Sequence, residues 1–316
     1  MLLINTIKVV VISLSILMID FCFAGTVIEI KAQPSQGFEF PFLLKIPDDS
    51  VNQSVKYLVV ETNNSGMASD DFEVHYQKAK NAIIGNAIGP WIAEKLQFPI
   101  LIPIFPRPET IWETYTHALD RDTLLIGSGN LKRLDLQLLA MIEQAKIELN
   151  KHAVNIESKV ILTGFSASGS LANRFSMLHP SSLQLVVAGG VNGILMLPLE
   201  KIDEEKLDYP IGINDFKQIV GKPFDKSAWV SLPQFLFMGK NDTNDAVEYD
   251  DAYSDSERKT IHSVLGHQMQ PERWIKCQDI YIKSNVNVVF HTYKSIGHET
   301  NLKIHNDILN FVKQNI

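Results

Sequence analysis

The sequence predicts an α/β fold built on a mostly parallel, doubly wound sheet with helices on both faces. Several short apolar segments are continuous, without alternating polar residues, which is typical of strands buried on both faces in a parallel sheet. Segments with apolar residues three and four positions apart lie between them, and this alternation of strand and helix indicates the same class. With 45% hydrophobic and 21% charged residues, the composition is that of a folded globular protein.

The expected strands are bounded by turn residues and are rich in β-branched and aromatic side chains. They span residues 26–31, 40–46, 57–61, 98–105, 160–163, 183–188, 234–238 and 286–293. Helices are expected over residues 79–96 with a break at Pro90, over 130–150 with Asn130 as the N-cap, from residue 167 to 179, and over 301–315. Residues 194–232 and 246–272 fit the alternation badly, so we expect them to leave the sheet as loops or a lid.

The N-terminal segment differs in kind from the rest of the chain. Lys8 precedes an apolar run over residues 9–19, which has the length of a signal-peptide core and is short for a membrane span. Cys22 and Ala24 fit the positions that a signal peptidase reads, so we expect residues 1–24 to be a signal peptide cleaved after Ala24. An uncleaved anchor is the alternative. Residues 25–316 are then expected to form a single secreted or periplasmic domain that meets the membrane only during export.

Charge, cysteine content and motifs argue against several classes of protein. The net charge of −7 argues against a nucleic-acid partner, because phosphate binding needs a basic surface. No His-Glu-x-x-His or paired-cysteine pattern occurs, so neither a metal nor another cofactor is expected. Cys277 would have no disulfide partner once Cys22 leaves with the signal, and the helical apolar spacing around Cys277 predicts a core thiol.

The segment KVILTGFSASGSLANRF, residues 159–175, places Ser166 where an expected strand turns at once into an expected helix. Gly164 and Ser168, two residues to either side, are small, as so sharp a turn requires. This is the G-x-S-x-G pattern of a nucleophile elbow, with Ser168 in place of the last glycine and Gly169 after it. Such a turn exposes the serine hydroxyl at the sheet edge. A serine-rich turn or helix cap is the alternative explanation of the pattern alone.

A serine nucleophile needs a histidine base and an acid that orients it, and in this architecture both follow later strands in the order serine, acid, histidine. His298 follows the last expected strand, and Asp242 follows the strand over 234–238. Asp245 is a second candidate for the acid. Asp242 is favoured because the turn that joins it to the strand is tighter.

An oxyanion hole is also expected, because negative charge develops on the carbonyl oxygen during acyl transfer. Its first donor would be the backbone N–H of Ala167, at a helix N-terminus where negative charge is favoured. The second would come from the loop after the strand over 57–61, from the N–H of either Asn63 or Asn64.

Three segments in this order, Gly164-Phe165-Ser166-Ala167-Ser168-Gly169, Gly239-Lys240-Asn241-Asp242 and Gly297-His298, resemble the α/β-hydrolase superfamily. The overall pattern is also similar to secreted polyhydroxybutyrate-depolymerase-like and feruloyl-esterase-like hydrolases. The resemblance implies an α/β-hydrolase fold and a serine hydrolase that cleaves esters of small or polymeric substrates through an acyl-enzyme. A prolyl-oligopeptidase-like peptidase with the same triad and a non-catalytic binding protein on this fold are the alternatives.

Overall fold

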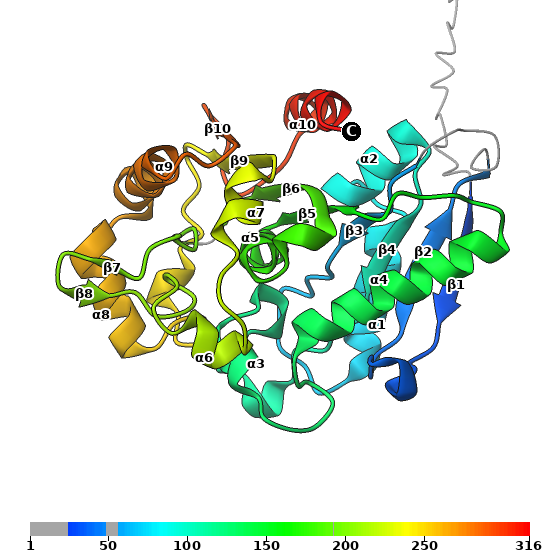
Figure 1. Cartoon of the computed structure of the whole chain (residues 1–316), viewed down its shortest axis with the longest axis horizontal. Helices are drawn as coiled ribbons and strands as arrows, with labels where there is room; N and C mark the ends of the chain where they lie inside the picture. Colours follow the sequence, from blue (N-terminus) through cyan, green and yellow to red (C-terminus); the bar gives the residue numbers. More distant parts are fainter. Residues whose placement is uncertain (1–24, 49–55, 192) are drawn as a thin grey trace, which may run out of the picture.

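The centre of the computed structural model, which describes residues 25–48, 56–191 and 193–316, is an eight-stranded sheet (Figure 1). Across the sheet the strands lie in the order β1-β2-β4-β3-β5-β6-β9-β10. β2 runs antiparallel to both of its neighbours, and the remaining adjacent pairs are parallel. The mostly parallel sheet predicted from the sequence is therefore confirmed.

All eight expected strands are present, each with ends within two residues of those predicted. They are β1 (Thr26–Ile30), β2 (Phe42–Ile46), β3 (Val59–Glu61), β4 (Ile100–Pro103), β5 (Val160–Phe165), β6 (Leu183–Gly189), β9 (Gln234–Gly239) and β10 (Val288–Tyr293). Burial on both faces explains the continuous apolar sequences of the six inner strands, whereas the edge strands β1 and β10 are half-buried or exposed along most of their length.

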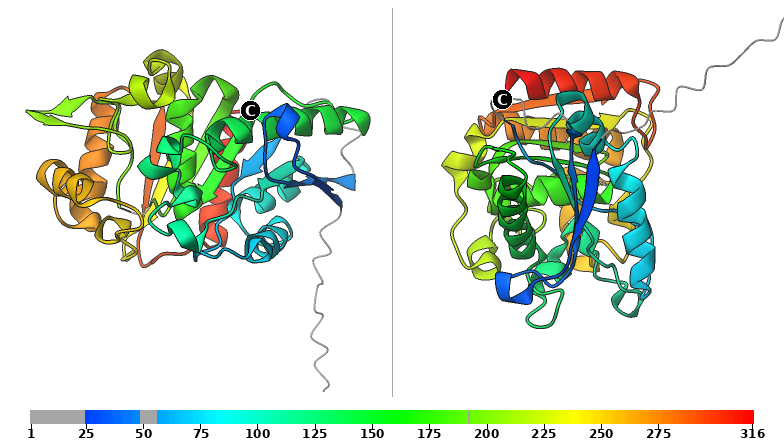
Figure 2. Two further views of the ribbon diagram at one scale, coloured as in Figure 1. Left: turned by 90° about the horizontal axis from the view of Figure 1, so that it is seen from below. Right: turned by 90° about the vertical axis from the view of Figure 1, so that its right-hand side faces the viewer.

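Successive residues of the inner strands contribute to two different apolar cores, one on each face of the sheet. Val60 and Leu162 pack with one core, whereas their neighbours Val59 and Ile161 pack with the other. The first core includes residues of α4 (Leu134–Lys151), α5 (Ala167–Leu178) and α9 (Trp274–Lys283); the second includes residues of α1 (Phe72–Ile83), α2 (Ile88–Leu96) and α10 (Leu302–Gln314). In the right-hand view of Figure 2, green helices and the cyan α1 lie on opposite sides of the strands.

The predicted helix break at Pro90 is wrong. The interruption falls at residues 84–87, between α1 and α2, and Pro90 lies in the first turn of α2. A proline is tolerated there because the N–H that it lacks would have no partner within the helix. The first of the two helices also begins earlier than predicted, at Phe72, where the Asp71 side chain accepts a hydrogen bond from the N–H of Glu73.

The predicted N-cap of α4, Asn130, is also wrong, because the helix begins at Leu134 with Arg133 as its N-cap in a left-handed conformation. The Arg133 guanidinium forms two hydrogen bonds to Asp135 in the first helical turn, at 2.8 and 2.7 Å. The Gln137 side chain donates to the carbonyl of Asn130 at 2.6 Å. The Arg133 side chain caps none of the first N–H groups of the helix; the start of the helix is held instead by contacts of Asp135 and Gln137 with the residues before it.

The two segments that fit the alternation badly add no strand to the eight-stranded sheet. Residues 194–232 hold a separate antiparallel pair, β7 (Lys201–Ile202) and β8 (Glu205–Lys206), followed by α6 (Phe216–Val220) and α7 (Lys226–Ser231). The second segment, which we name the 246–272 excursion, holds η6 (Ala246–Glu248), α8 (Asp255–Leu265) and most of η7 (Met269–Arg273).

The remaining short elements lie in loops around the sheet. They are η1 (Pro34–Gln36), η3 (Glu109–Ile111), η4 (Thr116–Ala118), α3 (Arg121–Leu125) and η5 (Pro180–Ser182). Within the described ranges, no helix is both long enough and apolar enough to span a membrane. The expected signal peptide, residues 1–24, lies outside the described residues.

Candidate active site

The residues predicted for the site all lie after the carboxyl ends of parallel strands. Asn63 and Asn64 follow β3, Ser166 follows β5, Asp242 follows β9 and His298 follows β10. Loops at this edge of a parallel sheet converge because the strands point the same way. A cavity of about 430 Å³ lies there, and its lining includes Asn64, Arg107, Ser166, Asn244, Asp251 and His298.

Ser166 occupies a strained turn between β5 and α5, with φ 62° and ψ −130°. Few non-glycine residues adopt a positive φ, and such conformations gather at functional sites. The turn is closed so tightly that a Cβ at Gly164 would lie 2.2 Å from the carbonyl oxygen of Ser168. A Cβ at Gly169 would lie 2.4 Å from the carbonyl oxygen of Gly189 on β6. Both glycines are therefore needed for this turn to pack against the sheet.

Ser168, which replaces the last glycine of the pattern, closes the turn with its own side chain. Its hydroxyl accepts a hydrogen bond from the N–H of Phe165 at 3.0 Å and donates one to the carbonyl of Phe165 at 2.8 Å. The side chain is buried, away from solvent. The replacement thus adds two hydrogen bonds to the elbow, and Gly169 supplies the close approach to β6.

His298 and Asp242 are brought together by the loops after the last two strands. Nδ1 of His298 lies 2.9 Å from Oδ2 of Asp242, whose side chain is buried. Oδ1 of the same carboxylate accepts the N–H of Asn244 at 2.9 Å. A carboxylate at Nδ1 holds the proton on that nitrogen and leaves Nε2 as an acceptor. The imidazole also packs on the ring of Phe165, with 4.8 Å between centroids, which places it beside the elbow.

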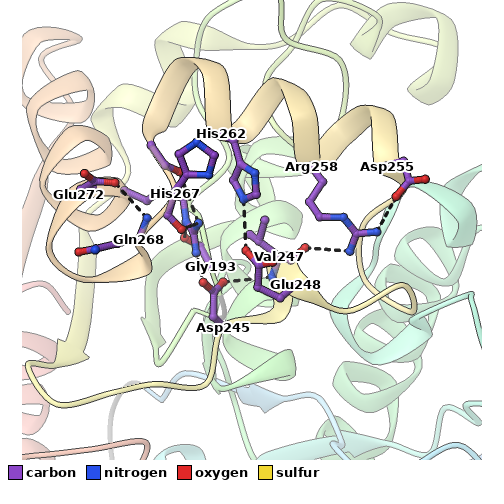
Figure 3. Close-up of polar contacts among 12 residues, drawn as sticks. Gly193, Asp245, Val247, Glu248, Asp255, Arg258, His262, His267, Gln268 and Glu272 are labelled. Atoms are coloured by element: carbon purple, nitrogen blue, oxygen red, sulfur yellow. Dashed lines mark hydrogen bonds and ion pairs between the residues drawn. The ribbon is translucent and has the colours of Figure 1, made fainter.

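Asp245, the second candidate for the acid, makes different contacts (Figure 3). Its Oδ1 accepts the N–H of Val247 at 3.1 Å, and its Oδ2 forms an ion pair with the buried guanidinium of Arg273. Figure 3 shows Asp245 below α8, among polar residues of the 246–272 excursion. This carboxylate therefore holds the excursion at its base, whereas that of Asp242 contacts His298.

Asn244 is a site residue that the sequence analysis missed. Its Nδ2 lies 3.1 Å from Nε2 of His298, the nitrogen that is left as an acceptor. The amide therefore donates to the same lone pair that a proton from Ser166 would need. In the sequence, only its position between the two candidate acids, Asp242 and Asp245, could have drawn attention to it.

The two asparagines considered for the oxyanion hole occupy different positions. The buried Asn63 side chain pairs with the backbone of Phe105, donating to its carbonyl at 2.8 Å and accepting its N–H at 3.1 Å. Asn64 lines the cavity that Ser166 also lines, and its Oδ1 accepts the N–H of Gly66 at 3.1 Å. Ala167 is the first residue of α5. Of the two asparagines, Asn64 is thus the one placed at the cavity.

Arg107 and Asp251 form a charged wall of the cavity that the sequence did not indicate. Arg107, only 5% exposed, lies 2.5 Å from Oδ2 of Asp251, and its guanidinium carbon is 3.7 Å from the ring centroid of Tyr115. Burial raises the pKa of the Tyr115 phenol, and the positive charge of Arg107 partly opposes that rise. Because Asp251 belongs to the 246–272 excursion, the pair ties that segment to the loop after β4.

The strand order, the elbow after β5, and an acid and a histidine after the last two strands define the α/β-hydrolase fold. Many solved structures are similar, and two of them serve as examples. Poly(aspartic acid) hydrolase-1 from Sphingomonas sp. KT-1 is similar with a TM-score of 0.56 and 16% identity, over 92% of this chain and 98% of that one. An S-formylglutathione hydrolase from Agrobacterium tumefaciens is similar with a TM-score of 0.51 and 12% identity, over 93% of this chain and 95% of that one.

At these identities the likeness establishes the fold and leaves the chemistry to be argued from the site. No protein-family model matches the sequence, and no curated protein matches it. The narrower resemblance to secreted polyhydroxybutyrate-depolymerase-like and feruloyl-esterase-like hydrolases stays a prediction.

Proposed function

We propose that this protein is a serine hydrolase that cleaves carboxylic ester bonds through an acyl-enzyme on Ser166. The observation that carries the proposal is the 2.9 Å contact between His298 and Asp242 beside a cavity that Ser166 and His298 both line. A histidine oriented by a buried carboxylate, next to a serine on a strained elbow, is the arrangement that makes a hydroxyl nucleophilic.

In the proposed reaction, Oγ of Ser166 attacks the ester carbonyl carbon while Nε2 of His298 takes the hydroxyl proton. Asp242 stabilises the imidazolium that forms. The N–H groups of Ala167 and Asn64 bind the oxyanion, and the leaving alcohol takes the proton from His298. A water molecule then hydrolyses the acyl-enzyme with the same base. Asn244 must release Nε2 before the first proton transfer, because that nitrogen has a single lone pair.

The fold hosts many activities and so does not identify the substrate class, which we propose from the chemistry of the leaving group. The names of the two structural neighbours, a poly(aspartic acid) hydrolase and an S-formylglutathione hydrolase, show that proteins of this shape differ in what they hydrolyse. We favour a small or polymeric ester because an alcohol leaves more readily than an amine. A prolyl-oligopeptidase-like peptidase and a non-catalytic binding protein are the outcomes that the test below separates from it.

The test combines a covalent probe with two substrate classes. We expect a fluorophosphonate to label the wild-type protein on Ser166, and short p-nitrophenyl esters to be hydrolysed with a higher kcat/KM than aminoacyl nitroanilides. Preference for the anilides would assign the peptidase instead. Absence of both labelling and turnover would leave a binding protein that retains the fold.

We also propose that the protein is exported by residues 1–24 and is secreted or periplasmic. The support is the sequence pattern of Lys8, the apolar run and Ala24. N-terminal sequencing of the exported product is expected to begin at Gly25. Recovery of Met1 on a membrane-bound form would contradict cleavage and would indicate an anchored enzyme.

A further inference from the structure

Two buried histidines that the proposed reaction does not use lie next to the loop that carries Asn64. His75 is on α1 and His117 is in η4, and their exposed fractions are 0% and 1%. Their rings meet edge to face, with 5.6 Å between centroids and 76° between planes. Buried imidazoles need hydrogen-bond partners, so their contacts show what they hold in place.

Both rings present a nitrogen to the same residue, Ser65. Nδ1 of His75 lies 2.6 Å from the Ser65 hydroxyl, and Nδ1 of His117 lies 3.4 Å from the Ser65 backbone N–H. Nε2 of His75 lies 2.9 Å from the carbonyl oxygen of Ser69 and 3.3 Å from the backbone nitrogen of Arg107. Nε2 of His117 lies 2.8 Å from the carbonyl oxygen of Phe105 and 3.3 Å from Nδ2 of Asn63. We name Ser65, His75 and His117 the Ser65 clamp.

The contacts assign the tautomer of His117: its Nδ1 faces the Ser65 N–H, which can only donate, and its Nε2 faces the Phe105 carbonyl, which can only accept, so the proton lies on Nε2. Nε2 of His75 lies between the Ser69 carbonyl and the N–H of Arg107, and its Nδ1 faces a hydroxyl that can donate or accept, so His75 can hydrogen-bond to Ser65 in either tautomer. Burial lowers the pKa of His117 to about 3, which keeps that ring neutral around pH 7. The side chain and the backbone of Ser65 are therefore each held by a nitrogen of a buried imidazole.

We propose that His75 and His117 are positioning residues that act through Ser65 to fix the backbone N–H of the adjacent Asn64 as the second donor of the oxyanion hole. This inference rests on the proposed function. Asn63 is already tied to Phe105 on the other side of Asn64, so the clamp immobilises the remaining flank of that residue. These side-chain contacts make the loop rigid, as is required if the backbone N–H of Asn64 is to stay in place as a donor.

A clamp of this kind affects the transition state more than substrate binding. The oxyanion carries its full charge only when the carbonyl has been attacked, so a misplaced donor lowers kcat and leaves KM nearly unchanged. The same donor binds the oxygen of a tetrahedral adduct. The affinity for a trifluoromethyl ketone inhibitor should therefore fall together with kcat.

The test compares replacements of nearly equal shape. His75→Asn keeps a hydrogen-bonding amide near the position of Nδ1, whereas His75→Leu removes it; His117→Asn and His117→Leu form a second such pair. With p-nitrophenyl butyrate, we expect each leucine variant to lose about 10-fold to 100-fold in kcat. KM should change by less than about threefold, and trifluoromethyl ketone affinity should fall in parallel with kcat. Each asparagine variant should recover most of the loss.

Ser69→Ala is the matched control, because it removes a hydroxyl from the same loop and keeps the carbonyl that His75 contacts. Its kcat should stay within about twofold of wild type. Thermal unfolding of every variant shows whether a loss of activity reflects a loss of folded protein. Ser65→Ala supplies an independent variant if a leucine variant does not fold, and its effect should not add to that of His75→Leu.

Folded leucine variants with wild-type kcat, or asparagine variants as impaired as the leucine ones, would overturn the clamp. A wild-type protein that neither hydrolyses esters nor reacts with a fluorophosphonate would instead overturn the proposed function. The two failures are thus distinguished by the behaviour of the wild-type protein.

Discussion

Replacing Ser166 with alanine is expected to abolish ester turnover, with a loss in kcat of about 10⁴-fold to 10⁶-fold. Alanine removes the hydroxyl that would form the acyl-enzyme, while the elbow keeps the backbone contacts from Ser166 to Gly189 and Ser170. Steady-state hydrolysis of p-nitrophenyl butyrate measures the loss. Circular dichroism and thermal unfolding should show a folded protein.

Ser168→Gly is the matched control for that variant, because it restores the glycine of the pattern and removes the neighbouring hydroxyl. We expect it to lose stability, since two hydrogen bonds to Phe165 disappear, and to keep kcat within about tenfold. If Ser166→Ala kept a tenth of the activity while Ser168→Gly lost it, the nucleophile would be Ser168.

Replacing Asp242 with asparagine is expected to lower kcat by roughly 10³-fold or more, with a much smaller effect on KM. The asparagine amide can donate to Nδ1 of His298 and so stabilise the wrong tautomer, in which Nε2 carries the proton and cannot act as a base. It also removes the negative charge that stabilises the imidazolium. The kcat and KM for p-nitrophenyl butyrate measure both effects.

The same substitution at Asp245 is the comparison, and its effect should fall on stability. It leaves the buried Arg273 without a charged partner, which we expect to cost about 3 kcal/mol of unfolding free energy. Turnover by the folded fraction should stay within about tenfold of wild type. Denaturant unfolding and active-site titration separate the two quantities, and an exchange of these outcomes would assign Asp245 as the acid.

The sequence predicted the sheet well because each strand carries its own local signal, a continuous apolar run between turn residues. Ser166, Asp242 and His298 could be proposed for a related reason, since Ser166 comes directly after such a run and the other two follow one after a short turn. The choice between Asp242 and Asp245 was harder, because both follow β9. The contacts that separate their roles are made with Arg273 and His298, which lie 28 and 56 residues further along the chain.

Other features had no local signal at all. His117 and Ser65 are 52 residues apart, and Arg107 and Asp251 are 144 apart, so only the folded chain brings each pair together. The error at Pro90 has a different cause. Proline breaks a helix interior but fits a first turn, and the sequence pattern did not distinguish the two positions.

The ion pair between Asp245 and Arg273 joins the two ends of the 246–272 excursion, across a sequence separation of 28 residues. The segment is thus a loop closed at its base, while Tyr249 and Asp251 near its start reach the cavity wall. Asp242 lies just outside this closure. The closed segment thus separates two kinds of position: Ile261 and Leu265 are buried in the first core and hold the segment in place, whereas Tyr249 and Asp251 form the cavity wall. Directed evolution of substrate range would therefore start at the wall positions, and the ion pair at the base would keep Asp242 in contact with His298.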